Sequence, residues 1–237
     1  MHRFEGRTIV LTGVGRKGQV GEVVAQAFAA EGATLTLVAR DPEQVTARAD
    51  ALRAAGHAVH PESCDLTDPD QVTALARTVG ARHGGRVDAL VNIAGGFAIS
   101  GPVADSEFIV WQRQLAINLT TAYLATRAFL PMLRTARGAI VYFASAAALP
   151  GERIAGMSAY VAAKSGVIAL TRAVAQEERD SGVRANAIAP TTVRTAANLD
   201  SMSDTTRYVE REEVARTALF LCSADASAVT GQILRLA

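Results

Sequence analysis

Short apolar segments rich in β-branched residues alternate with longer amphipathic segments along almost the whole chain. Runs such as residues 8–12 and 139–143 are typical of parallel strands that are covered on both faces. Because parallel strands need crossover connections, the alternation predicts an α/β fold, a doubly wound parallel sheet of about seven strands with helices on both faces. The expected strands are residues 8–12, 33–39, 58–61, 87–92, 139–143, 184–188 and 232–236.

Helix signals fill the intervals between these strands. Residues 19–31 form an amphipathic segment that is followed by a glycine, the residue favoured just past a helix end. Residues 41–42 and 68–69 are both Asp-Pro, which combines a capping aspartate with a proline at the first helical position. The two longest helices are expected at residues 107–134 and 158–181.

The composition limits the class of partner. A hydrophobic share of 49% with 20% charged residues suffices for a core, and we interpret residues 1–237 as a single domain. The 24 basic and 23 acidic side chains nearly cancel, so neither nucleic acid nor a membrane is an expected partner. Cys64 and Cys222 provide no disulfide framework, which favours a cytoplasmic location. His57 and His60 would point to opposite faces of a strand, and no metal site is expected.

A glycine-rich turn follows the first expected strand and opens the first expected helix. Its Gly-x-Gly-x-x-Gly spacing, starting at position 13, matches the fingerprint of folds that seat a dinucleotide pyrophosphate on a helix N-terminus. A turn without a ligand is the alternative, which the position between strand and helix disfavours. The candidate cofactor-binding residues here are Thr12, Gly13, Gly15, Arg16, Lys17 and Gly18.

The end of the second expected strand bears on the choice of dinucleotide. An acidic residue there would bind the ribose 2′-hydroxyl of NAD, whereas an arginine accommodates the 2′-phosphate of NADP. We interpret Arg40 as the phosphate ligand and Asp41 as the helix cap before Pro42. This favours NADP(H). In the competing interpretation Asp41 binds the ribose, and NAD(H) stays possible.

Tyr160 and Lys164 lie four positions apart, one helical turn along the same face. With four tyrosines and two lysines in 237 residues, this spacing is rare by chance. An ammonium beside a phenol is expected to lower the pKa of the phenol, as proton transfer at neutral pH requires. The pair is therefore the strongest candidate for a catalytic site.

The sequence resembles the short-chain dehydrogenase/reductase family over nearly its whole length. Several motifs occur in the family's order, which makes the resemblance specific. They are Thr12-Gly13 with the following glycines, Asp65-Leu66, Asn92-Ile93-Ala94-Gly95, Asn118, Ser145, Tyr160 with Lys164, and Asn186-Ala187-Ile188-Ala189-Pro190.

The resemblance implies a Rossmann-type fold and a role for each matching residue. Tyr160 would exchange a proton with the substrate oxygen, which Ser145 would orient, and Lys164 would bind the nicotinamide ribose. Asn118 would anchor a water in the proton relay. Ordinary structural roles remain open for Ser145, Asn118 and Asp65. The other implied cofactor contacts are Asp65 and Leu66 at the adenine, Asn92, Ala94 and Gly95 beside the cofactor, and Pro190, Val193 and Thr195 after the sixth strand, the last two where the family holds the carboxamide.

Two departures from the family pattern are evident. The glycine turn is two residues longer between Gly13 and Gly21, which leaves open which glycine faces the pyrophosphate. The segment that follows Pro190 is polar and short, and Thr191 stands where the family has glycine.

The expected function is an NADPH-dependent carbonyl reductase or alcohol dehydrogenase, of the 3-oxoacyl-carrier-protein reductase type, acting on a small molecule. The alternatives are a dihydropteridine reductase-like enzyme and a non-catalytic dinucleotide sensor. Apolar residues on several sides of the two longest helices predict a homodimer or homotetramer. They are Ala122, Leu124, Ala125, Phe129, Val167, Ala169, Leu170 and Ala173. Phe97, Leu149, Met157 and Met202 are candidates to line the substrate site, or else ordinary core residues.

Overall fold

The computed structural model describes residues 2–201 and 207–237, which build one fully parallel sheet in the order β3-β2-β1-β4-β5-β6-β7. This confirms the predicted doubly wound α/β fold. The strands are β1 (Thr8–Thr12), β2 (Thr34–Ala39), β3 (Val59–Ser63), β4 (Ala89–Asn92), β5 (Ala139–Phe143), β6 (Arg184–Pro190) and β7 (Ile233–Leu236). The order reverses between β1 and β4, where ligands of such sheets bind.

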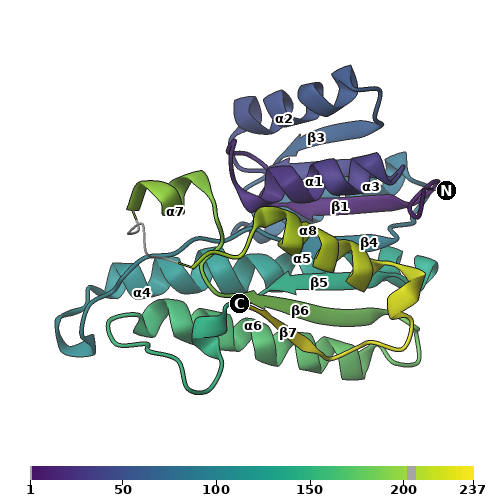
Figure 1. Ribbon diagram of the computed structural model, residues 1–237. Helices are drawn as coiled ribbons and strands as arrows, with labels where there is room; N and C mark the ends of the chain where they lie inside the picture. Colours follow the sequence, from purple (N-terminus) through teal and green to yellow (C-terminus); the bar gives the residue numbers. More distant parts are fainter. Residues whose placement is uncertain (1, 202–206) are drawn as a thin grey trace.

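Helices cover both faces of the sheet (Figure 1). α1, α2 and α8 pack on one face, and α3, α5 and α6 pack on the other. Successive strand residues point to opposite faces, so Ile9 and Leu11 join the first core while Val10 joins the second. The helices are α1 (Val20–Ala30), α2 (Pro42–Ala54), α3 (Pro69–Arg82), α4 (Phe108–Leu115), α5 (Thr121–Ala136), α6 (Ser158–Glu177), α7 (Ala196–Ser201) and α8 (Arg211–Cys222).

Both Asp-Pro helix starts are confirmed. The Asp41 carboxylate accepts hydrogen bonds from the backbone N–H groups of Glu43 and Gln44, and Asp68 caps α3 in the same way. Each cap satisfies donors that the first helical turn leaves free.

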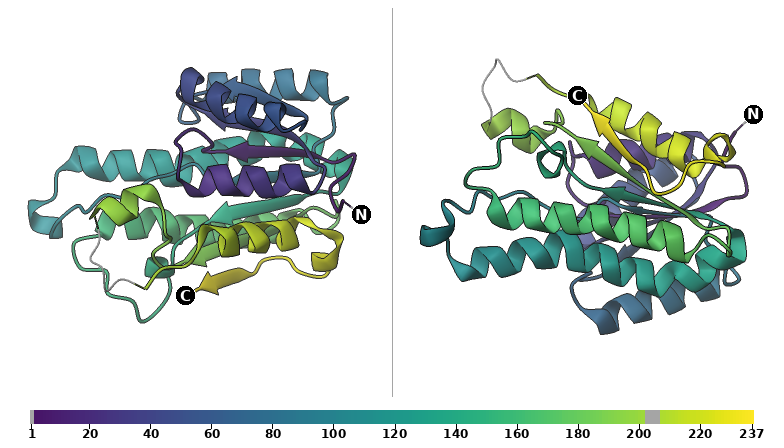
Figure 2. Two further views of the ribbon diagram at one scale, coloured as in Figure 1. Left: turned by 45° about the horizontal axis from the view of Figure 1, so that its top comes forward. Right: turned by 90° about the horizontal axis from the view of Figure 1, so that it is seen from below.

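The long helix expected at 107–134 is interrupted. α4 and α5 are joined by a π-helical turn at Ala116–Thr120, in which the backbone N–H of Thr121 bonds the carbonyl of Ala116. The turn holds one residue more than a regular helical turn. The turn contacts α6, and the right view of Figure 2 shows α6 running alongside the continuous helix that α4, the turn and α5 form.

The prediction of wide apolar surfaces on these helices is partly wrong. Ala122, Ala125, Phe129 and Val167 are buried in the second core, because α5 and α6 use these faces against the sheet. The others are half-buried, as Leu124 and Leu170 are, or exposed, as Ala169 and Ala173 are. The large apolar side chains left exposed along this stretch are instead Phe108, Ile109, Trp111 and Tyr123.

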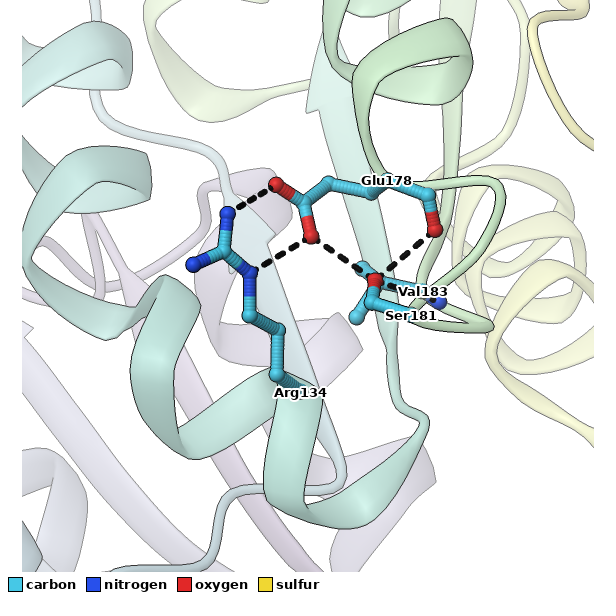
Figure 3. A network of polar contacts seen from close by, with 4 residues as sticks. All are labelled: Arg134, Glu178, Ser181 and Val183. Carbon is cyan, nitrogen blue, oxygen red and sulfur yellow. Dashed lines mark hydrogen bonds and ion pairs between the residues drawn. The ribbon is translucent and has the colours of Figure 1, made fainter.

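A buried ion pair joins the distal ends of α5 and α6 (Figure 3). The Nε and Nη2 atoms of Arg134 donate to the two carboxylate oxygens of Glu178, at 2.8 and 2.5 Å, and the hydroxyl of Ser181 donates to the same carboxylate at 2.7 Å. The side chain of Glu178 is only 3% exposed, while that of Arg134 is half exposed.

The loops that carry the candidate site residues gather at the opposite end, along the carboxyl edge of the strands (Figure 1, left). They are residues 93–107, residues 144–157 and the α7 region. No helix among the described residues is long and apolar enough to cross a membrane.

Candidate active site

The glycine turn is held tightly between β1, β2 and β4. The backbone N–H of Gly13 donates to Val38 at 2.8 Å, and Gly13 has a φ of +76°. A side chain on Gly13 would come within 2.7 Å of the backbone of Ala94, and one on Gly21 within 2.5 Å of the carbonyl oxygen of Gly13. Glycine is therefore required at both positions, and Gly21 is the glycine that lets α1 pack against the strand end.

Gly15 and Gly18 have different neighbours. A side chain on Gly15 would lie 3.2 Å from the Cβ of Ala39 at the end of β2. Gly18 has a φ of +74°, and its carbonyl accepts a hydrogen bond from the backbone N–H of Ala196 at 3.0 Å. The lengthened turn thus reaches across to the first residue of α7.

Glu22 ties this turn to α2, a role that the sequence did not reveal. One carboxylate oxygen of Glu22 accepts from the backbone N–H of Gly18 at 2.7 Å, and the other from Arg48 at 2.5 Å. Arg48 neutralises a negative charge that would otherwise lie close to an expected pyrophosphate.

Thr12 is buried and acts as a bridge between strands. Its hydroxyl oxygen accepts from the backbone N–H groups of Ile93 and Ala94, at 3.1 and 3.2 Å. Thr12 thereby fixes where the loop after β4 begins, instead of presenting its hydroxyl to a ligand.

The three cations expected near a 2′-phosphate are exposed. Arg16 and Lys17 lie in the glycine turn, and Arg40 follows β2. No ion pair to any of them is seen within the described part of the chain. Asp41 caps α2, as expected from its position before Pro42.

Asp65 and Leu66 follow β3. The Asp65 carboxylate accepts from the hydroxyl and the backbone N–H of Thr67, at 2.7 and 2.9 Å, and these bonds lower the pKa of Asp65. Asp65 is therefore a turn-forming residue here, and Leu66 is buried beneath it.

Asn92 and Gly95 mark the end of β4. The Oδ1 atom of Asn92 is buried and has no hydrogen-bond partner among the described residues. A side chain on Gly95 would come within 2.6 Å of the Oδ1 atom of Asn118 and 3.5 Å of the Lys164 ammonium. The chain passes this point only because Gly95 lacks a side chain.

Asn118 lies buried within the π-helical turn and anchors the loop after β4. Its amide nitrogen donates to the carbonyl of Gly96 at 2.9 Å, and its Oδ1 accepts from the Gly96 N–H at 3.1 Å. The same nitrogen contacts the carbonyl of Gln114 at 3.1 Å, a group close to the point where the helix widens. Asn118 thus holds the loop that carries Phe97.

Ser145, Tyr160 and Lys164 come together from two elements. Ser145 follows β5, while Tyr160 and Lys164 lie one turn apart near the start of α6. The Ser145 hydroxyl lies close enough to Tyr160 to lower the pKa of its phenol. The ammonium of Lys164 is 5.8 Å from the centre of the Tyr160 ring and donates to the carbonyl of Phe143 at 2.7 Å. The grouping expected from the sequence is present in the structure.

The pKa of Tyr160 differs from the expectation. Burial raises it, and the nearby Ser145 hydroxyl offsets this only in part. The net lowering predicted from the sequence is therefore wrong, because the effect of burial is the larger one. Burial also lowers the pKa of Lys164 itself to about 8.

The segment after β6 carries the remaining candidates. Pro190 ends β6, and Val193 and Thr195 are buried. Val193 pairs with Val209, and the Thr195 hydroxyl accepts from the Asn198 N–H at 3.3 Å, close to the start of α7. Helix α7 was not expected from the sequence, and Met202 lies outside the described residues.

Phe97, one of the residues predicted to line the substrate site, packs edge-on against Tyr160, with ring centres 5.0 Å apart. Leu149 and Met157, two other candidates, are half-buried. Among the described residues, no group of three histidine, cysteine, aspartate or glutamate side chains could hold a metal ion.

These residues fit a dinucleotide. Gly13 and Gly21 let the start of α1 pack against the end of β1, and α1 begins without a side-chain cap, so its first N–H groups can bind a phosphate. The unpartnered Oδ1 of Asn92 adds a buried acceptor at the same edge.

A doubly wound parallel sheet with this turn and a Ser–Tyr–Lys group on its carboxyl edge defines the Rossmann-type, NAD(P)-dependent oxidoreductases. Residues 13–236 match the family described as enoyl-(acyl carrier protein) reductase. The chain belongs to the short-chain dehydrogenase/reductase family.

Individual relatives extend over nearly the same length. A (5R,7aS)-5-hydroxy-7a-methyl-1-oxo-2,3,5,6,7,7a-hexahydro-1H-indene-carboxyl-CoA reductase of Mycobacterium tuberculosis is 35% identical, covering 98% of this chain and 92% of its own. The meso-2,3-butanediol dehydrogenase of Serratia marcescens is 33% identical, with 97% and 92% covered. The structure of a short-chain type dehydrogenase/reductase from Mycobacterium ulcerans superposes with a TM-score of 0.89 at 31% identity, covering 98% of this chain and 89% of that one.

Proposed function

We propose that this enzyme is an NADP(H)-dependent carbonyl reductase and alcohol dehydrogenase in which Tyr160 transfers the proton. The observation that carries the proposal is the group of Ser145, Tyr160 and Lys164 at the carboxyl edge of the sheet, with Asn118 beside it. A nicotinamide cofactor supplies the hydride for the carbonyl carbon.

The side chains divide the remaining work. The Tyr160 hydroxyl donates its proton to the carbonyl oxygen, so that ketone becomes alcohol, and the reverse transfer accompanies oxidation. Ser145 donates a hydrogen bond that orients this oxygen. The charge of Lys164 stabilises the tyrosinate that proton transfer leaves behind. Burial raises the pKa of Tyr160 further above neutrality, so the side chain rests in the protonated form that the reductive direction uses.

Tyr160→Phe tests this role. The variant should bind NADPH with nearly unchanged affinity, while kcat for ketone reduction falls at least 100-fold, the size expected for general acid catalysis. NADPH binding can be followed by calorimetry and turnover by NADPH absorbance. A kcat within a few-fold of wild type would exclude Tyr160 as the proton donor. If the wild type binds NADPH but supports no single turnover, the chain is a dinucleotide sensor.

The preference for NADP(H) rests on the end of β2. Arg40 is exposed and can contact a 2′-phosphate, whereas Asp41 is engaged in capping α2. The turn that carries Arg16 and Lys17 passes beside Ala39, because a side chain on Gly15 would lie 3.2 Å from its Cβ. To bind the ribose of NAD, the Asp41 carboxylate would have to give up its hydrogen bonds to the first turn of α2.

Arg40→Asp is expected to shift the cofactor preference toward NADH by at least 10-fold in kcat/KM, because it replaces the phosphate partner with a carboxylate. Arg53→Asp, on α2, is a control that should leave the ratio of NADPH to NADH unchanged. An unchanged ratio in the Arg40 variant would refute the assignment.

A further inference from the structure

A large aromatic side chain is left exposed directly against Tyr160. Phe97 is 51% exposed although its ring packs perpendicular to the ring of Tyr160, with centres 5.0 Å apart. Part of the Phe97 ring therefore remains open to a molecule that approaches the Tyr160 hydroxyl.

Phe97 lies between two fixed points of its loop. On one side, Asn118 holds both backbone groups of Gly96. On the other side, the backbone N–H and the hydroxyl of Ser100 donate to the carbonyl of Gly156, at 2.8 and 3.1 Å. The hydrogen bonds at Gly96 and Ser100 thus fix the position of Phe97, although its own side chain is half exposed.

The same contacts bring a second loop alongside. Gly101 also donates to the carbonyl of Gly156, at 3.1 Å, and the hydroxyls of Ser100 and Ser158 are 3.3 Å apart. Ser158 is the first residue of α6, two positions before Tyr160. Residues 96–101 and 154–158 are therefore joined by hydrogen bonds at the N-terminus of α6, the helix that carries Tyr160.

These two joined loops expose large apolar side chains to solvent. Ile99 is 71% exposed and Ile154 is 46% exposed, and a side chain on Gly156 would lie 3.8 Å from Ile99. We call Phe97, Ile99 and Ile154 the apolar wall. Exposing three large apolar side chains is unfavourable in water unless a ligand covers them.

The surroundings of the apolar wall carry little charge. Residues 93–104 and 144–151 contain no ionisable side chain. Glu152, the first ionisable residue after the second segment, is paired with Arg235 at 2.7 Å, and Arg153, next to Ile154, is exposed. The polar groups of Ser100 and Gly156 are already bonded to each other, so the wall offers few partners to the hydroxyl groups of a polyol.

We propose that the apolar wall selects the substrate: a ketone or secondary alcohol whose carbonyl carbon bears a ring or branched hydrocarbon, in preference to hydroxylated chains. The inference rests on the function proposed above, since it needs the reacting carbonyl at Tyr160. The hydrocarbon group packs on Phe97, Ile99 and Ile154, and its burial contributes to kcat/KM.

Two ketones that differ in this group test the proposal, with NADPH at saturation. Wild-type enzyme should reduce cyclohexyl methyl ketone with a kcat/KM at least 10-fold above that for hydroxyacetone. Phe97→Ser should lower the value for cyclohexyl methyl ketone by roughly 10- to 100-fold, mainly through KM, and change that for hydroxyacetone less than about 3-fold. Phe97→Leu should retain most of the preference. Phe220→Ser, at another exposed phenylalanine on α8, is the matched control and should change neither value.

Several outcomes would overturn the proposal. A wild-type preference for hydroxyacetone contradicts it. An equal fall for both ketones in Phe97→Ser means that Phe97 only supports Tyr160.

Calorimetry separates this inference from the proposed function. If no ketone is turned over, binding of cyclohexyl methyl ketone to the NADPH complex is compared between wild type and Phe97→Ser. Binding that is lost in the variant supports the apolar wall and overturns the reaction. Absence of binding in both overturns both.

Discussion

Lys164 is buried beside the proposed proton donor and bonded to the carbonyl of Phe143. With its pKa lowered to about 8, the side chain is charged at pH 7 and loses its charge within the range in which the enzyme can be assayed. The raised pKa of Tyr160 places its own ionisation at higher pH. The two groups should therefore be separable in a pH profile.

The kcat/KM for ketone reduction should be level below pH 8 and fall as the pH rises through about 8, because the cation at Lys164 is lost. Lys164→Arg should be at least 10-fold less active, since a guanidinium does not replace a compact ammonium at one carbonyl. Its remaining activity should lack the fall near pH 8, since arginine keeps its charge. The same fall in the variant would assign it to another group.

The sequence led to residues whose chemistry is rare, and missed residues whose role depends on position. Lys164 stood out because the chain has only two lysines. Glu22 did not, because a helical glutamate is common, and Phe97 was only one of four candidates to line the substrate site. The direction of the Tyr160 pKa was wrong since spacing along a helix does not reveal how deeply the pair is buried.

Elements defined by buried apolar runs were predictable, while irregular ones were not. β1 and β5 agree with the expectation because their residues are covered on both faces. Helix α7 has six residues, and its first residue donates a backbone hydrogen bond to Gly18, which is distant in sequence. The π-helical turn was missed because its apolar pattern continues across the extra residue.

Removing either partner of the ion pair between Arg134 and Glu178 should destabilise the fold, but by different amounts (Figure 3). In Arg134→Met, the carboxylate of Glu178 stays buried without its partner, so Tm at pH 7 should fall by roughly 3–8 °C. Glu178→Gln should cost less, because Arg134 is half exposed and water can solvate it.

The pH dependence of this effect has a defined sign. Arg134 lowers the pKa of Glu178, so its contribution is present above the ordinary glutamate pKa and is lost as the pH falls. The Tm deficit of Arg134→Met should therefore shrink between pH 7 and pH 4, as measured by calorimetry. Arg172→Met, an exposed arginine on α6, is the control and should show no such trend. A deficit that grows in acid would contradict this account.

At the scale of the whole molecule, α4 and α5 carry four large apolar side chains that are exposed. Phe108, Ile109 and Trp111 lie on α4, and Tyr123 lies on α5. A surface of this kind usually marks an interface, and two-fold pairing is the commonest arrangement. We therefore still predict a homodimer at least, now through these four residues.

Light scattering at micromolar concentration should give at least twice the mass of the 24.8 kDa chain. Tyr123→Arg should shift the mass toward one chain, because it places like charges opposite each other across a two-fold axis. Phe220→Arg, on α8, should leave the mass unchanged. A wild-type mass of one chain would refute the dimer.

The π-helical turn makes this enzyme sensitive to the length of its chain as well as to its side chains. Successive residues of a helix are rotated by about 100° about its axis. Loss of one residue from Ala116–Thr120 would therefore restore a regular helix and rotate all of α4 relative to α5. Asn118 would then face away from Gly96, although every neighbouring side chain was retained. Single-residue insertions and deletions here would be selected against even where substitutions are tolerated. The site therefore requires a fixed number of residues between α4 and α5.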